Sequence, residues 1–232
     1  MSEFERIAAN PANWHSGADL ASHTLMGERA ERTARAYMAL LKDVAGARCL
    51  EGSSIDLGAG AGYLVRAFRA AGVPMAASEH TVAGVGLLQR ENPGLPVRQD
   101  SVAAFHEPGQ HRLLVARELY PFTRVSAFTE QLASIGRLID SLESGGAMLL
   151  SGSDVAAPHC LDMHLLARTL ENDTRVRAVS GPWLEALLVR GGPMAGSALW
   201  RALSHAAVAP YAAWRQRYGK WAAIRTLAVV KR

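Results

Sequence analysis

Short apolar runs alternate with amphipathic stretches between residues 53 and 151, and this alternation limits the fold more than any other feature of the sequence. The apolar runs are too short for helices and are bounded by turn residues, which is typical of buried strands. The amphipathic stretches repeat apolar residues every three or four positions, as helices do. Strands that alternate with helices at this spacing predict an α/β protein with a mostly parallel sheet and ligands at the carboxyl ends of its strands.

The predicted elements follow from this pattern. Seven strands are predicted, at residues 54–57, 73–78, 96–98, 113–116, 147–150, 175–179 and 224–230. The predicted helices cover residues 28–45, 63–71, 82–89 and 161–170. A further long helix is predicted to begin after Ser126, as its cap, and to be closed by Gly145 and Gly146. Most of the chain between residues 182 and 218 is also predicted to be helical. The expected fold is therefore α/β, a Rossmann-like, mostly parallel seven-stranded sheet with helices on both faces.

Two domain-level expectations accompany this fold. Residues 1–48 are expected to form a helical N-terminal cap, and residues 49–232 the α/β domain with a helical insertion at about 182–221. The chain has no run of eighteen uncharged apolar residues and no export signal at its start, which argues against a transmembrane segment and against secretion. Its two cysteines, Cys49 and Cys160, form neither a disulfide framework nor a zinc motif, so we expect a cytoplasmic protein without a bound metal.

The glycine-rich segment Asp56-Leu57-Gly58-Ala59-Gly60-Ala61-Gly62 leaves the first predicted strand and enters a helix. A dinucleotide fingerprint would need a glycine at position 63, where this chain has Tyr63, and a phosphate-binding P-loop would end in Gly-Lys-Ser/Thr. Asp56 comes directly before the loop, and a carboxylate there is a poor neighbour for a pyrophosphate. The segment therefore favours a cationic ligand.

An acid followed by Gly-x-Gly-x-Gly resembles the S-adenosylmethionine (SAM) loop of the class I (Rossmann-like) methyltransferases, and the resemblance covers about residues 53–150. It implies that Glu79, at the end of the second strand, accepts hydrogen bonds from both ribose hydroxyls. It also implies that Asp100, at the end of the third strand, accepts one from the adenine amino group. The predicted cofactor-binding residues are Asp56, Gly58, Ala59, Gly60, Gly62, Tyr63, Glu79, His80, Asp100, Ser101 and Arg117. The implied cofactor is SAM, and the product is S-adenosylhomocysteine (SAH).

The segment after the fourth strand faces the methyl group in this family. It lacks the Asn/Asp-Pro-Pro-Tyr/Phe motif of enzymes that methylate DNA bases or glutamine, which argues against a DNA substrate. Glu118 is the candidate base or ammonium ligand, and Tyr120 the candidate that orients a nucleophile. The alternative, which the sequence favours equally, is that Glu118 pairs with Arg117 or Arg124 and only closes the loop. In small-molecule methyltransferases the N-terminal segment commonly forms a lid, so Trp14, His15 and His23 are candidate substrate-binding residues.

The C-terminal segment from residue 181 to 232 is strongly basic, with eight basic residues against a single acid, Glu185. Four of the five tryptophans lie in it, and Tyr211, Trp214, Tyr218 and Trp221 fall on one helical stripe. Core packing, an RNA site and a membrane-facing helix all fit this stripe. The sequence therefore predicts a SAM-dependent methyltransferase acting on N or O of a small molecule. The alternatives are an RNA or phospholipid-headgroup methyltransferase that uses the basic segment, and a non-catalytic SAM-binding protein.

Overall fold

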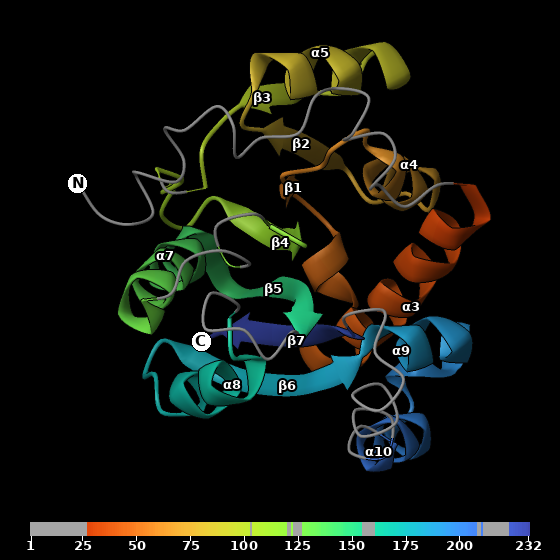
Figure 1. Cartoon of the computed structure of the whole chain (residues 1–232), viewed down its shortest axis with the longest axis vertical. Helices are drawn as coiled ribbons and strands as arrows, with labels where there is room; N and C mark the ends of the chain where they lie inside the picture. Colours follow the sequence, from red (N-terminus) through yellow and green to blue (C-terminus); the bar gives the residue numbers. More distant parts are fainter. Residues whose placement is uncertain are drawn as a thin grey trace.

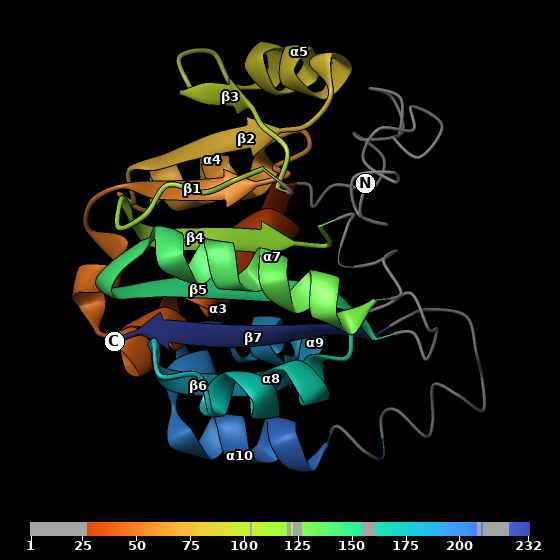
Figure 2. The same ribbon diagram turned by 90° about the vertical axis from the view of Figure 1, so that its left-hand side faces the viewer.

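A computed structural model describes residues 27–102, 104–119, 122, 127–154, 161–207, 210 and 223–232 of the chain. Its centre is a seven-stranded sheet with the strand order β3-β2-β1-β4-β5-β7-β6. Strand β7 runs antiparallel to both of its neighbours, and the other pairs are parallel (Figure 2). This is the mostly parallel α/β sheet that the alternating pattern predicts.

The strands are β1 (Ser54–Leu57), β2 (Met75–Glu79), β3 (Val97–Gln99), β4 (His111–Arg117), β5 (Leu142–Asp154), β6 (Val176–Leu184) and β7 (Ala223–Lys231). The α-helices are α3 (Gly27–Ala45), α4 (Tyr63–Ala70), α5 (Val82–Glu91), α7 (Phe128–Ser141), α8 (Met163–Glu171), α9 (Glu185–Gly191) and α10 (Ala198–Ala206). Two 3-10 helices, η2 (Ala47–Leu50) and η3 (Gly192–Gly196), follow α3 and α9.

Helices cover both faces of the sheet (Figure 1). On one face α7 and α8 pack on a cluster that includes Leu114, Leu150 and Leu166. On the other, α3, α4 and α5 bury a second cluster, and α3 also packs with α9 and η3 through Leu40 and Leu188. Residues in central parallel strands are apolar on both sides because both faces are covered.

Three sequence predictions about these elements are wrong. Helix α7 ends at Ser141, and the two glycines thought to close it lie inside β5, where the register with β4 shifts. A Cβ at Gly146 would lie 3.0 Å from the backbone oxygens of Glu143 and His111, so the glycine permits a close strand approach. The N-cap of α7 is Ala127 without a side-chain hydrogen bond, while Ser126 lies outside the described residues. Strand β6 also continues to Leu184, so the helical part of the insertion begins at residue 185.

Among the described helices, none is long and apolar enough to cross a membrane. The described part of the predicted insertion consists of α9, η3 and α10, and α3 lies against it. The aromatic stripe from Tyr211 to Trp221 lies outside the described residues. The division of the chain at residue 48 stays a prediction.

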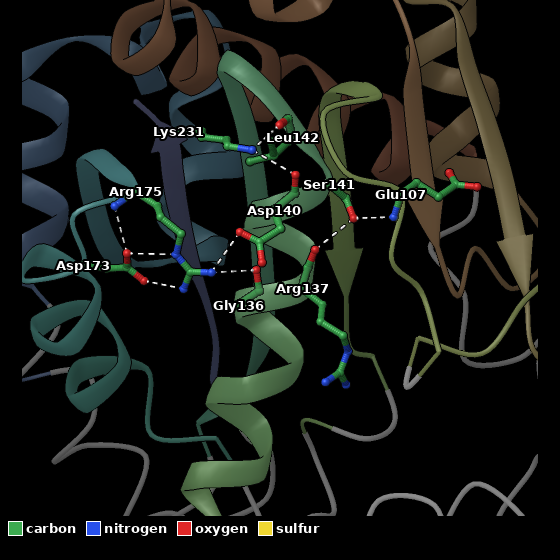
Figure 3. A network of polar contacts seen from close by, with 9 residues as sticks. All are labelled: Glu107, Gly136, Arg137, Asp140, Ser141, Leu142, Asp173, Arg175 and Lys231. Atoms are coloured by element: carbon green, nitrogen blue, oxygen red, sulfur yellow. Dashed lines mark hydrogen bonds and ion pairs between the residues drawn. The ribbon is translucent and has the colours of Figure 1, made fainter.

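A polar network joins the end of α7, the start of β5 and the end of β7 (Figure 3). The Lys231 ammonium, at the end of β7, donates to the backbone oxygens of Asp140 and Leu142 at 2.9 and 2.6 Å. Arg175 bridges Asp140 and Asp173, with N–O distances of 2.9 and 2.6 Å. The last carbonyls of a helix have no partner within the helix, and a cation beside them also interacts favourably with the helix dipole. The network therefore caps α7 and fixes the start of β5.

We expect Lys231→Met to lower the free energy of unfolding by about 1–3 kcal/mol, because it leaves partly buried carbonyls without their charged donor. Urea denaturation measures this loss. Lys42→Met is the control, since Lys42 is an exposed lysine in the last turn of α3. Equal stability of the two variants would contradict a capping role for Lys231.

Candidate functional site

The glycine loop joins the end of β1 to the start of α4, at the carboxyl edge of the parallel strands. Gly58, Gly60 and Gly62 all have positive φ angles, of 69°, 58° and 76°. A Cβ at Gly62 would lie 2.5 Å from Leu88 Cδ1 and 2.6 Å from the Asn92 amide nitrogen. The loop therefore needs glycine for its backbone conformation and, at Gly62, for close packing against the protein.

Glu79, the last residue of β2, is turned toward this loop. The carboxylate of Glu79 is buried and accepts from the backbone N–H of Gly60 at 3.0 Å and of His80 at 2.8 Å. Each carboxylate oxygen has a second lone pair, so both can still accept a hydroxyl. A Cβ on Gly84 would lie 2.4 Å from Glu79 Cγ, so this glycine lets α5 approach the side chain. The structure thus brings Glu79, Gly60 and His80 together, and these residues fit a ligand with a cis-diol.

Asp56 lies in the middle of the sheet and is 3% exposed. Burial raises the pKa of Asp56 to about 8; the positive charge of Arg117 opposes this rise and the charge of Glu79 adds to it. A buried carboxylate of this kind is stabilised as an anion when a cationic ligand arrives. The arrangement suits a sulfonium or ammonium group close to the loop.

The end of β3 differs from the simplest expectation, because Asp100 is already engaged. Its Oδ2 lies 2.6 Å from Arg98 Nη2, and the same Arg98 nitrogen lies 2.7 Å from Glu107 Oε1. Hydrogen bonds from Arg98, and then from His111, lower the pKa of Glu107 to about 2 against the effect of burial. Arg98 therefore fixes the segment that follows β3. The contact of Asp100 with adenine, like that of Ser101, stays a prediction.

Arg117, at the end of β4, forms an ion pair with a residue that was not considered from the sequence. Its Nε and Nη2 donate to the two carboxylate oxygens of Glu185, each at 2.9 Å. Its predicted contact with the cofactor stays a prediction. Glu118, the next residue, is half-buried and has a φ of 52°, and its backbone N–H donates to the carbonyl of Ser151 at 2.8 Å. A left-handed glutamate is uncommon and is tolerated only where the surroundings impose it, often at functional sites.

The other predicted residues fall in different places. Ala59 donates its backbone N–H to the carbonyl of Ser78, and Tyr63 begins α4 with the guanidinium of Arg66 5.1 Å from its ring centroid. Four of the predicted residues lie outside the described residues: Tyr120, Trp14, His15 and His23. Among the described residues, Glu118 is therefore the remaining candidate for contact with the methyl acceptor. The part of the chain that the structure describes contains no group of three or more His, Cys, Asp or Glu side chains suited to a metal ion.

Sequence reasoning missed two residues of this region, Tyr37 of α3 and Glu185 of α9. Both are buried, and the Tyr37 hydroxyl donates to Glu185 Oε2 at 2.5 Å. Tyr37 looked like one apolar position of an amphipathic helix. The signal for Glu185 was present, because it is the single acid in a segment with eight basic residues. An acid kept alone among cations is a candidate for a specific ion pair.

Comparison with solved structures identifies the fold. The glycopeptide N-methyltransferase MtfA, complexed with SAH, matches over 96% of this chain and 98% of its own, at 15% identity and a TM-score of 0.55. Magnesium protoporphyrin IX methyltransferase (ChlM) from Synechocystis PCC 6803, with bound SAM, matches over 93% of this chain and 91% of its own, at 13% identity and a TM-score of 0.57. The chain therefore has the fold of the class I methyltransferases, as predicted.

Other similarities are partial or absent. DesVI from Streptomyces venezuelae matches over 59% of this chain and 57% of its own, at 20% identity and a TM-score of 0.46, so this chain spans little more than half the length of DesVI. No protein-family model matches the chain, and no curated protein matches its sequence.

Proposed function

We propose that the protein is a SAM-dependent methyltransferase that transfers a methyl group to N or O of a small-molecule acceptor and releases SAH. The observation that carries this proposal is the pairing of the glycine loop with Glu79 at the carboxyl edge of β1 and β2. The loop brings glycines without side chains to the end of β1, and Glu79 offers acceptors to the ribose diol. A buried carboxylate at Asp56 adds a site for positive charge.

Methyl transfer requires little from the protein beyond alignment of the cofactor and the acceptor. SAM supplies an electrophilic methyl group, and holding a nucleophile in line with it contributes up to about 7–11 kcal/mol of the barrier. We assign Glu118 to the acceptor side, where its carboxylate holds an ammonium or removes a proton from a hydroxyl. Its position supports this role, because Glu118 directly follows β4 and has an uncommon left-handed backbone conformation, which often occurs at functional sites.

The solved structures of the same fold are named for small and medium-sized acceptors, a glycopeptide in one case and magnesium protoporphyrin IX in another. These names support a small-molecule acceptor and leave the methylated atom, N or O, as part of the proposal. The aromatic stripe of the basic C-terminal segment lies outside the described residues, and the described part of the segment supports no competing acceptor class.

The cofactor assignment predicts that Glu79→Gln lowers the affinity for SAM about tenfold or more, because charged acceptors for the ribose hydroxyls are lost. Isothermal titration calorimetry with the wild-type protein and the variant measures this. The control is Glu91→Ala, which removes an exposed acid from the end of α5. Absence of SAM binding by the wild-type protein would refute the proposed function.

Transfer itself is tested with radiolabelled SAM and fractionated cell extract. The proposed enzyme labels a low-molecular-weight fraction, and Glu118→Gln reduces that labelling while SAM binding is retained. Label in RNA or phospholipid would replace the proposed acceptor class. Binding of SAM without label in any fraction would indicate a protein that binds the cofactor and does not transfer the methyl group.

A further inference from the structure

A row of polar side chains crosses the middle of the sheet at the end that carries the glycine loop. Asp56 of β1 lies opposite Val115 of β4. Arg117 lies opposite Ser151 of β5, which in turn lies opposite Thr226 of β7. Residues two apart on a strand point to the same face, so Arg117 shares the face of Val115 and Asp56. The row therefore lies on the face of the sheet that α3 and α9 cover (Figure 1).

Glu185, the first residue of α9, binds Arg117 through both carboxylate oxygens, and the two side chains are 5% and 12% exposed. The single proton of the Tyr37 hydroxyl goes to Glu185, so this hydroxyl accepts from Ser151 Oγ at 2.8 Å. Ser151 in turn accepts from Thr226 Oγ1 at 2.9 Å. Burial, together with the charge of Glu185, raises the pKa of Tyr37 well above its usual range, so the hydroxyl keeps its proton. The hydrogen bonds run in one direction and end on the carboxylate that holds the guanidinium.

Stability alone is a weak explanation for this network. Removing two charges from water costs several kcal/mol per ion, and a buried pair is often replaced by apolar residues without loss of stability. What a bidentate arginine–carboxylate pair does supply is a fixed position for the guanidinium. The position fixed here is at the end of β4, next to the strand that carries Asp56.

The charged groups around the row explain why that position matters. Those that act on Asp56 are Arg117 on β4, which favours the ionised carboxyl, and Glu79 on β2, which disfavours it. Those that act on Arg117 are Glu185 on α9 and Glu118 directly after β4, and the protonated Tyr37 of α3 donates to Glu185 beside them. Arg117 is therefore the cation that offsets the burial of Asp56, and Glu185 holds its guanidinium through two hydrogen bonds.

We propose that Glu185 and Tyr37 are positioning residues of the methyl-transfer site, which hold the Arg117 guanidinium on the face of the sheet that carries Asp56, as the countercharge with which this buried carboxyl receives a cationic cofactor. The inference rests on the proposed binding of SAM. It gives α9 and α3 a role in the cofactor site although neither contributes to the glycine loop. It also assigns Arg117 the role of a countercharge to Asp56.

The test is the pH dependence of SAM affinity between pH 5.5 and 9, measured by calorimetry. In the wild-type protein the affinity rises with pH as Asp56 ionises. In Arg117→Met the cation is lost, and the midpoint of this rise moves upward by about 1 unit or more. Circular dichroism and thermal unfolding establish that each variant is folded.

Glu185→Gln separates positioning from a simple charge effect by the sign of the shift. Acting only through space, the loss of a negative charge would favour ionisation of Asp56 and move the midpoint downward. If Glu185 positions Arg117, the released guanidinium leaves Asp56 and the midpoint moves upward, as in Arg117→Met. The double variant then shows no larger shift than Arg117→Met alone, because both substitutions act through the same guanidinium.

Tyr37→Phe keeps every charge and removes one hydroxyl, so it tests the same inference if Glu185→Gln does not fold. We expect a smaller upward shift of the midpoint. The matched control is Asp43→Asn, which breaks the 2.7 Å ion pair of Asp43 on α3 with Arg201 on α10, away from the row, and leaves the midpoint in place. A downward or absent shift in Glu185→Gln and no shift in Tyr37→Phe would overturn the inference. SAM binding by the wild-type protein, measured in the same series, keeps that outcome distinct from failure of the proposed function.

Discussion

Asp56→Asn is expected to make the protein more stable than the wild type at pH 8 and to weaken SAM binding by about tenfold or more. The Asp56 carboxyl has a pKa of about 8 in the folded protein, against its ordinary value of 3.8. Between these values the folded state binds a proton that the unfolded state has released, so wild-type stability falls as pH rises. The slope is about 1.4 kcal/mol per pH unit, and it ends above the folded pKa.

Urea denaturation at pH 5, 6.5 and 8 measures this difference. The advantage of Asp56→Asn grows across the series, while Glu91→Gln controls for the loss of a negative charge at an exposed position. SAM affinity of Asp56→Asn also loses the pH dependence of the wild type. A stability difference that stays constant with pH would show that Asp56 is ionised in the folded protein throughout this range. A site that destabilises the fold in exchange for ligand binding is common in enzymes.

Gly62→Ala is expected to lower SAM affinity at least about tenfold and to destabilise the protein. The positive φ of Gly62 costs an alanine about 1–2 kcal/mol. The new methyl group would also collide with Leu88 and with the Asn92 amide, which donates to the carbonyls of Ala61 and Leu88 at 2.9 Å each. The collision would displace the end of the glycine loop. Calorimetry with SAM and thermal unfolding measure the two effects.

Gly72→Ala separates backbone strain from packing. Gly72 also has a positive φ, of 88°, but a Cβ there would meet nothing within 4 Å. This variant should lose about 1 kcal/mol of stability and keep its SAM affinity. If the two alanine variants bind SAM equally well, the packing of the loop against α5 is not what shapes the site.

The sequence prediction was most detailed for the half of the sheet that carries the candidate cofactor site. Strands β1 to β4 and helices α3 to α5 were identified because their apolar periodicity and the glycines between them agree with the tertiary structure. The sequence prediction placed the end of α7 too late, because a pair of glycines such as Gly145 and Gly146 occurs both after a helix and at an irregularity in a strand. Only the pairing of β5 with β4 distinguishes the two.

The candidate site divides in the same way. The glycine loop and Glu79 are neighbours through local strand–loop geometry, so a motif was sufficient to find them. Glu185 and Tyr37 reach Arg117 and each other across 68 and 148 residues of sequence. No spacing rule connects such positions. Their contact depends on how α3 and α9 pack on one face of the sheet, and that packing is a property of the assembled fold.

The place of β7 in the sheet has a consequence for biosynthesis. This strand lies between β5 and β6, although both are made before it. Until residues 223–231 have left the ribosome, β6 lacks the neighbour with which it pairs and β5 keeps an open edge. Exposed strand edges are templates for pairing with other chains. The edges of β5 and β6 are therefore the last in the sheet to be covered, well after the glycine loop has been synthesised.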